Sequence, residues 1–345
     1  MHTNYIFSLQ ALRALAFAGI LTYHCGLLPL GAWGVSIFFI LSGFVIMLRY
    51  HEKEIACSLR SNLCFAFKCI RKIYPLHIFM TVVVIIRDYI QFGVIDMNMP
   101  KLIANLLLLS SWFPKSMGLN CYNGVAWFLS SILFSYFMFP VFVKIFKRDK
   151  PINPVAIVLF ILGLQGLLLL LYNFLNVEKD FLIWLSYENP VFRAGDFLIG
   201  MALFSIYSCQ RERSTYINKN LGIACLLLLG VTCLLDLTYF RPHQIDAFRK
   251  TLLYSPTAIM FVYLFAFSEL WLSRLLTTKT MVYLGNMSGL YFLIHQFMIY
   301  NAKWAIYGAG EWGGLKDKMV VCIVAALLTV CFAYIFKKLM ALFAN

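Results

Sequence analysis

The chain is poor in charge and rich in apolar residues. Only 13% of its 345 residues are charged, and there are 15 acidic residues against 29 Lys and Arg. With 62% hydrophobic residues and a mean hydropathy of +0.80, the composition excludes an ordinary soluble domain and is typical of a polytopic helical membrane protein. No nucleic-acid partner is expected, because basic loops at the inner face of a membrane explain the positive charge.

Other features are missing as well. The ten cysteines are scattered, with no CxxC pair and no metal-ligand spacing, so no metal site is expected. There is no internal repeat and no low-complexity linker, so residues 1–345 are interpreted as one integral-membrane domain. The first apolar run lacks a preceding basic segment and a small-residue cleavage site, so we expect it to be retained rather than cleaved as a signal peptide.

The apolar runs predict an all-α fold with about ten membrane-spanning helices. The expected spans are 8–28, 31–50, 74–95, 125–146, 154–175, 191–209, 218–237, 251–272, 281–301 and 319–339. With the N-terminus inside, the inner loops hold 17 of the 29 Lys and Arg residues and the outer loops hold 9. This bias predicts that both termini are cytoplasmic. Segment 100–113 is apolar but short, and is interpreted as a re-entrant or interfacial helix.

The first span contains two polar residues with an informative spacing. Arg13 and His24 are separated by three helical turns plus about 20°, so they share one helix face and lie about 16 Å apart along the axis. A charge at membrane depth costs free energy and is usually kept for function. An arginine that extends to the membrane surface and a histidine bonded to a neighbouring helix would leave the same pattern.

Polar residues on four helices fall at one expected depth. In this topology the outer half of the membrane contains His24, Trp127, Ser130, Arg193, Asp196 and His295. Arg193 and Asp196 are three residues apart and can pair on one helix face. A structural ion pair, a packing histidine and an interfacial tryptophan are the simpler alternatives. The agreement in depth predicts a polar cavity that crosses the membrane and admits one ligand from each side.

Two further features lie near the inner face. The basic loop 49–73 has the pattern of an amphipathic helix on the membrane surface, and its Lys68, Arg71 and Lys72 suit either the phosphates of a cytosolic ligand or lipid headgroups. In the second span, Ser42 and Gly43 are expected to allow close helix packing.

Six motifs occur in order along nearly the whole chain. They are Arg13-x10-His24, FFILSGF at 38–44, RKIYPLH at 71–77, WFLSSILFSYFMFP at 127–140, FRAGDFLIGM at 192–201 and LGNMSGLYFLIH at 284–295. Together they resemble the acyltransferase-3 family of integral membrane O-acyltransferases, in a short form without an SGNH-type hydrolase domain. The chain departs from that family where Asp196 replaces Glu, where Ile132 stands at a position that is Glu in many members, and where Cys69 replaces a basic residue.

The resemblance implies a reaction and a location. An acetyl or other acyl group would pass from acetyl-CoA to a hydroxyl of a cell-envelope sugar, such as O-antigen of lipopolysaccharide, at the bacterial cytoplasmic (inner) membrane. No tightly bound cofactor is expected, because acetyl-CoA is a substrate. The other expected partners are an envelope glycan or lipid-linked sugar, and membrane lipid.

Within this reaction each candidate residue has an expected role. His24 is the candidate general base, and an acyl-His intermediate is an alternative. Arg13 suits the phosphates of CoA, as do the three basic residues of loop 49–73. Arg193, oriented by Asp196, would stabilise an oxyanion or orient the acceptor. The expected acceptor-binding residues are Trp127, Ser130 and His295.

Two other functions use the same residues differently. Charges within the membrane and a through-cavity also suit a transporter or flippase for a glycolipid or small anion, although the chain has no repeat. An acyl-relay subunit would keep the chemistry but require a separate acceptor-binding partner. Release of CoA distinguishes the enzyme from the transporter.

Overall fold

The computed structural model describes residues 5–93, 98–147, 152–212, 219–308 and 313–342. Within these ranges the chain is all-helical and contains no strand. The longer helices are α1 (Phe7–His24), α2 (Gly31–Tyr50), α3 (Leu59–Ile70), α4 (Tyr74–Phe92), α6 (Trp127–Phe146), α7 (Pro154–Phe174), α9 (Pro190–Glu212), α10 (Leu221–Leu235), α12 (Ser255–Ala266), α14 (Lys279–Tyr307) and α15 (Leu315–Leu342). The shorter segments are α5 (Met99–Leu106), η1 (Ser110–Trp112), η2 (Lys115–Met117), α8 (Lys179–Ile183), η3 (Trp184–Glu188), η4 (Asp236–Phe240), α11 (Asp246–Lys250) and α13 (Trp271–Leu276).

Several helices begin or end where the sequence provides a cap. At the start of α3, the Ser58 and Ser61 side chains each accept a hydrogen bond from the other residue's backbone N–H. α7 begins with Asn153 as its cap and Pro154 in its first turn. α4 ends at Phe92 and is followed by Gly93, whose φ of 68° is in the left-handed region that glycine adopts easily.

Seven helical stretches among the described residues are long and apolar enough to cross a membrane. They are Gly31–Tyr50, Tyr74–Phe92, Trp127–Phe146, Pro154–Phe174, Lys179–Glu212, Leu221–Phe240 and Leu315–Leu342. These stretches support an integral membrane protein, and they match seven of the expected spans.

The other three expected spans correspond to α1, α12 and α14, which do not meet both conditions. α12 has only 12 residues, whereas α1 and α14 carry polar side chains such as Arg13 and His295. The number of ten spans and the cytoplasmic position of both termini therefore stay predictions. α5, which overlaps the short apolar segment 100–113, has 8 residues and cannot span a bilayer, which needs about 20.

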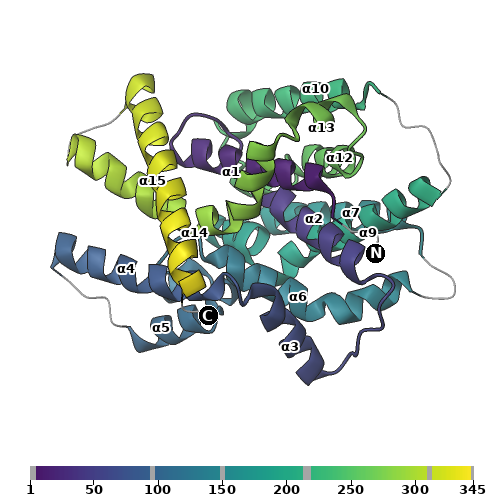
Figure 1. Cartoon of the computed structure of the whole chain (residues 1–345), viewed down its shortest axis with the longest axis horizontal. Helices are drawn as coiled ribbons and strands as arrows, with labels where there is room; N and C mark the ends of the chain where they lie inside the picture. Colours follow the sequence, from purple (N-terminus) through teal and green to yellow (C-terminus); the bar gives the residue numbers. More distant parts are fainter. Residues whose placement is uncertain (1–4, 94–97, 148–151, 213–218, 309–312, 343–345) are drawn as a thin grey trace.

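The helices form a buried centre and a lipid-exposed periphery. The apolar part of α2 is 94% buried, whereas those of α7, α10 and α15 are 17–22% buried. α2 packs against α9, α1 and α12, and α1 packs against α14. Figure 1 shows α1 and α2 in the middle of the molecule, with α15 to the left and α10 at the top.

α2 and α9 cross in direct backbone contact. A Cβ atom at Gly43 would collide with the carbonyl oxygen of Phe197, and one at Gly200 would collide with that of Ile40. The prediction that the small residues of the second span allow close packing is therefore confirmed at Gly43. Because α2 and α9 contact so closely, they form a rigid support for the functional site.

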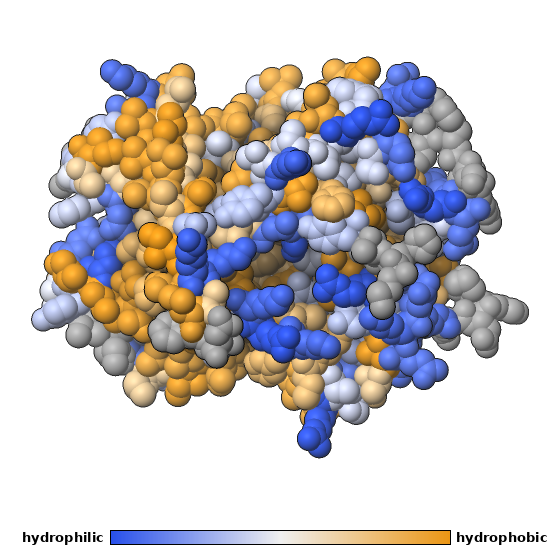
Figure 2. Space-filling model, in the orientation of Figure 1, coloured by the Kyte–Doolittle hydropathy of each residue, from blue (hydrophilic) through white to orange (hydrophobic). Residues whose placement is uncertain are grey.

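Hydrophobic and hydrophilic residues gather on different parts of the surface. Figure 2 shows hydrophobic surface over α15, whereas hydrophilic residues gather in the middle and at the right of this face. α15 exposes large apolar side chains, among them Ile323, Leu327 and Ile335. In a membrane these side chains would contact lipid.

Candidate active site

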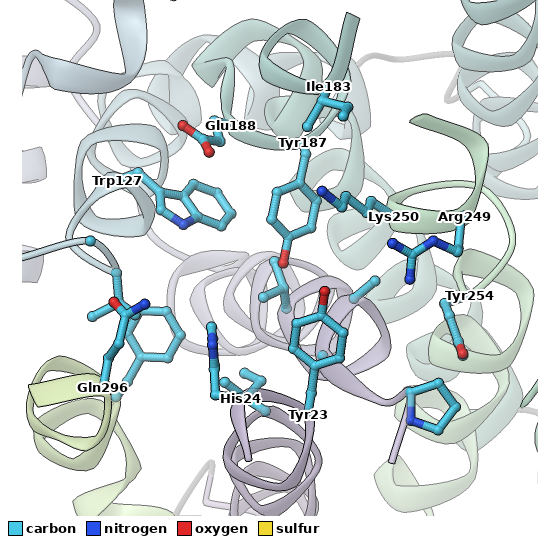
Figure 3. A pocket seen from close by; sticks show the side chains of 18 of the residues that line it. Tyr23, His24, Trp127, Ile183, Tyr187, Glu188, Arg249, Lys250, Tyr254 and Gln296 are labelled. Carbon is cyan, nitrogen blue, oxygen red and sulfur yellow. The ribbon is translucent and has the colours of Figure 1, made fainter. Parts of the chain in front are cut away.

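His24 lies in a cavity of about 210 Å³ where the C-terminal end of α1 meets several loops and short helices. This His24 cavity is lined by, among others, Tyr23, His24, Lys115, Trp127, Tyr187, Glu188, Asp236, Arg249, Lys250, Tyr254 and Gln296. Figure 3 shows most of these side chains around the cavity, with the hydroxyl groups of Tyr23 and Tyr187 facing each other. The sequence predicted two of the lining residues, His24 and Trp127.

The imidazole of His24 packs against two other rings. Its centroid lies 5.4 Å from that of Tyr23 and 5.2 Å from that of His295. His295 is fully buried behind His24, and its Nδ1 lies 2.8 Å from the carbonyl oxygen of Phe292. If Nδ1 donates this hydrogen bond, Nε2 is an acceptor, and Nε2 has no hydrogen-bond partner in the described part of the chain. The structure thus brings the two predicted histidines together.

Aromatic side chains form one wall of the His24 cavity. The rings of Trp127 and Tyr187 lie 4.9 Å apart. Trp127 is the first residue of α6, and Tyr187 belongs to the π-helical segment η3 that precedes α9. Such faces suit the apolar side of a sugar ring, because they offer area without taking up its hydroxyl groups.

Charged side chains also line the His24 cavity. Lys115 pairs with Glu188 at 2.8 Å. Arg249 donates to Asp246 at 2.5 Å and lies 3.7 Å from Asp236, which is 1% exposed. α11, which lies outside the candidate spanning segments, therefore places the basic Arg249 beside the two acidic side chains.

The pKa values of the two basic residues at the end of α11 shift in opposite directions. Burial alone would lower the pKa of Arg249, but the hydrogen bond and the charge of Asp246 outweigh burial and raise it above its usual value. Burial also lowers the pKa of Lys250, and here the nearby Asp246 opposes the shift without cancelling it. The Lys250 ammonium is therefore the less well compensated of the two cations.

Arg193 and Asp196 lie beside the His24 cavity but do not line it. They pair at 2.7 Å, as their spacing predicts, with both side chains at most 2% exposed. Arg193 also donates to the backbone carbonyl of Tyr187 at 2.7 Å and to that of Lys250 at 3.4 Å. The guanidinium thus holds two lining segments in place from behind.

Ser130 also lies outside the cavity lining. It is buried, and its Oγ accepts a hydrogen bond from the backbone N–H of Ser111 at 3.3 Å. The Ser111 hydroxyl in turn donates to the carbonyl oxygen of Trp127 at 2.7 Å. This position suits a residue that fixes the η1 segment against α6.

Arg13 lies in a second cavity, of about 180 Å³. This Arg13 cavity is also lined by Ser42, Lys72, Tyr136 and Phe128, among others. The Nε of Arg13 is buried and has no hydrogen-bond partner among the described residues. A buried, unsatisfied guanidinium nitrogen suits an anionic ligand.

Of the three basic residues predicted to bind phosphate near the inner face, only Lys72 lines the Arg13 cavity. Lys68 and Arg71 are exposed at the surface of the molecule, away from this lining. Lys72 itself is also exposed, so it stands at the opening of the cavity.

Three phenylalanines stand between the two cavities. Phe292 lines both, so the structure contains two cavities that meet at this ring, in place of the predicted continuous one. The Phe128 ring lies 5.0 Å from that of Phe292, and Phe38 lies about 6 Å from each. We call these three residues the aromatic partition.

Sequence reasoning missed most of the His24 cavity. Tyr23 adjoins His24 and was open to prediction by proximity. In the sequence, Lys115, Arg249 and Lys250 counted only among the basic residues of the expected outer loops. The π-helical turn that presents Tyr187 leaves no pattern in the sequence. Their convergence depends on contacts between distant segments.

Comparison with known proteins places the chain among acyltransferases. The sequence model of the acyltransferase-3 family, described as an acyltransferase domain, matches residues 6–338. The chain is 31% identical over 125 residues to the acyltransferase MdmB of Streptomyces mycarofaciens, covering 34% of this chain and 30% of MdmB. It is 25% identical over 306 residues to the peptidoglycan O-acetyltransferase OatA of Listeria monocytogenes, covering 84% of this chain and 48% of OatA. The chain therefore spans less than half the length of either relative, and no solved structure matches it.

Proposed function

Because the chain belongs to the acyltransferase-3 family, we propose that it is a membrane O-acyltransferase that moves an acetyl group from acetyl-CoA to a hydroxyl of an envelope sugar. In a bacterial cytoplasmic membrane, the donor would reach the protein from the cytosolic side and the acceptor from the outer side. One relative is named for O-acetylation of peptidoglycan, which supports an envelope glycan as the acceptor class. O-antigen is another member of that class.

The observation that carries this proposal is the position of Arg13 and His24 on one helix. Each faces a different cavity, and the two cavities meet at Phe292. A cation suited to phosphate thus lies on one side of the aromatic partition, and an imidazole suited to proton transfer lies on the other. The flexible pantetheine arm of CoA would bridge this distance.

In the proposed reaction His24 acts as the general base. Its imidazole takes the proton of the acceptor hydroxyl while the hydroxyl oxygen attacks the thioester carbonyl. The carbon–sulfur bond then breaks, the ester forms, and the CoA thiolate takes the proton from the His24 imidazolium to leave as CoA thiol, which returns His24 to its neutral form. A positioned base of this kind contributes about 10²–10⁴-fold to the rate. His295, packed against His24, would fix the imidazole orientation.

The donor is proposed to lie in the Arg13 cavity. The phosphates of CoA would meet Arg13 and Lys72, because guanidinium and ammonium groups bind phosphate through charge-assisted hydrogen bonds. Lys68 and Arg71, which lie outside this lining, would then attract CoA or lipid at the surface without contacting the bound thioester.

Thiol release from acetyl-CoA by purified protein, with envelope glycan present, tests the proposal. We expect His24→Ala to lower kcat at least 10²-fold, whereas Arg13→Ala raises the KM for acetyl-CoA about tenfold. His243→Ala and Arg274→Ala are the matched controls, because both residues are exposed and line neither cavity.

Two outcomes would contradict the proposal. Unchanged activity of folded His24→Ala protein would remove His24 as the base. Absence of thiol release from the wild type with several acceptors would favour a transporter or a missing partner.

A further inference from the structure

Each carboxylate that lines the His24 cavity already has a partner. Glu188 is paired with Lys115 at 2.8 Å. Asp236 accepts a hydrogen bond from the hydroxyl of Tyr254 at 2.7 Å and lies 3.7 Å from Arg249. Both carboxylates therefore already lie beside basic groups of the protein, and the Oδ1 of Asp236 faces Arg249 without a hydrogen bond among the described residues.

Lys250 is the basic lining residue that lacks such a partner. Its ammonium makes no ion pair and no hydrogen bond in the described part of the chain, whereas its backbone is held through Arg193 at 3.4 Å. Figure 3 shows the Lys250 side chain reaching into the cavity beside the ring of Tyr187. A partly buried cation without a partner costs free energy, and an incoming anion would offset this cost.

The basic groups around the cavity outnumber the acidic ones. The lining contains Lys115, Arg249 and Lys250 against Glu188 and Asp236. Arg249 is shared between Asp246 and Asp236, and Asp236 also lies 3.9 Å from Arg241, which is outside the lining. With the Lys115–Glu188 pair balanced, Lys250 gives the cavity one uncompensated positive charge. The electrostatic preference of the cavity is therefore for a ligand with a negative charge.

The rest of the lining suits a sugar. Trp127 and Tyr187 form an aromatic wall, and Tyr23 and Glu188 offer hydroxyl and carboxylate groups for hydrogen bonds. A cavity of about 210 Å³ is smaller than most ligand pockets, which measure about 300–1,000 Å³, so it suits a single sugar unit at the end of a longer glycan.

We infer that Lys250 is the anion-binding group of an acceptor subsite, and that the acceptor sugar carries a carboxylate or phosphate group next to the hydroxyl that is acylated. This inference rests on the proposed function, because His24 lines the same cavity. It narrows the acceptor from any envelope sugar to an acidic one, held through its charge while His24 meets its hydroxyl.

Binding to the purified protein tests the inference without requiring turnover. Glucuronic acid, glucose and glucose 6-phosphate are compared by quenching of intrinsic tryptophan fluorescence, since Trp127 lines the cavity. We expect the acidic sugars to bind at least tenfold more tightly than glucose, and Lys250→Gln to abolish most of this preference. The comparison of glucuronic acid with glucose 6-phosphate identifies whether a carboxylate or a phosphate is favoured.

Two further variants make the test specific. Lys250→Arg should keep the preference for acidic sugars, because the charge remains. Lys179→Gln is the control, since Lys179 is exposed on α8 and does not line the cavity. Equal binding of all three sugars to the wild type, or an unchanged preference in folded Lys250→Gln, would overturn the inference.

Kinetics separate this inference from the proposed function. With a uronic-acid oligosaccharide and its carboxyl-reduced form as acceptors, Lys250→Gln should raise the acceptor KM only for the acidic form and leave the KM for acetyl-CoA unchanged. A wild type that transfers acetyl equally well to both forms refutes the acidic acceptor and retains the transferase. A wild type that binds glucuronic acid but releases no thiol refutes the transferase alone.

Discussion

At the scale of single residues, Arg193 and Asp196 show that the role of a residue pair depends on what its side chains pack against. Both side chains are almost fully buried, and the guanidinium lies over the rings of Tyr187 and Phe39 at 4.7 and 5.5 Å. Such a cation is far from water, so its charge depends on Asp196. The geometry favours a positioning role for the pair in shaping the His24 cavity.

Removal of one partner of this pair should destabilise the protein strongly. Asp196→Asn leaves the buried Arg193 charge uncompensated, which costs about 3–5 kcal/mol, whereas the double change Arg193→Met with Asp196→Leu should cost less than either single change. Thermal unfolding in detergent checks both effects. Additive losses in the double variant would show that the two residues do not act as a buried ion pair.

At the scale of helices, the crossing of α2 and α9 depends on glycine. Gly200→Ala should lower the melting temperature markedly, because its methyl group would meet the backbone of Ile40, which cannot move without separating the helices. Gly230→Ala in α10 is the control, since no atom lies within 4 Å of its added Cβ. Equal tolerance of both changes would contradict the close crossing.

The aromatic partition is the second feature at this scale. Replacement of Phe292 by alanine should join the two cavities and admit water to the thioester. We expect Phe292→Ala to increase hydrolysis of acetyl-CoA without an acceptor at least several-fold, whereas Phe332→Ala, on α15, should not. Thiol release in the absence of glycan is the measurement, and no increase would mean that other side chains keep the cavities apart.

At the scale of the whole molecule, the orientation in the membrane is open to direct measurement. The bias of Lys and Arg predicts that the loop containing Cys57 is cytoplasmic and that Lys179 is on the outer side. In single-cysteine variants, Cys57 should react with a membrane-impermeant maleimide only in inside-out vesicles, and Lys179→Cys only in intact cells. The reverse pattern would invert the topology and move the donor site to the other face.

The sequence alone determined the features that depend on neighbouring residues. Hydropathy and spacing predicted an all-helical membrane protein, and the motifs predicted the family, which the family match confirms. The second span was predicted with the bounds that α2 has, because a long apolar run and its polar flanks are local properties. The separation of Arg13 and His24 in the sequence also predicted that they share one helix face.

Only the tertiary structure decided which residues share a cavity with His24. Tyr187, Arg249 and Lys250 come from short segments whose positions depend on packing against distant helices. Arg193 lies outside the lining and donates to the backbone carbonyls of Tyr187 and Lys250. Phe292 separates two cavities for the same reason. Local periodicity specifies the face of a helix, but contacts between segments far apart in sequence decide what that face meets.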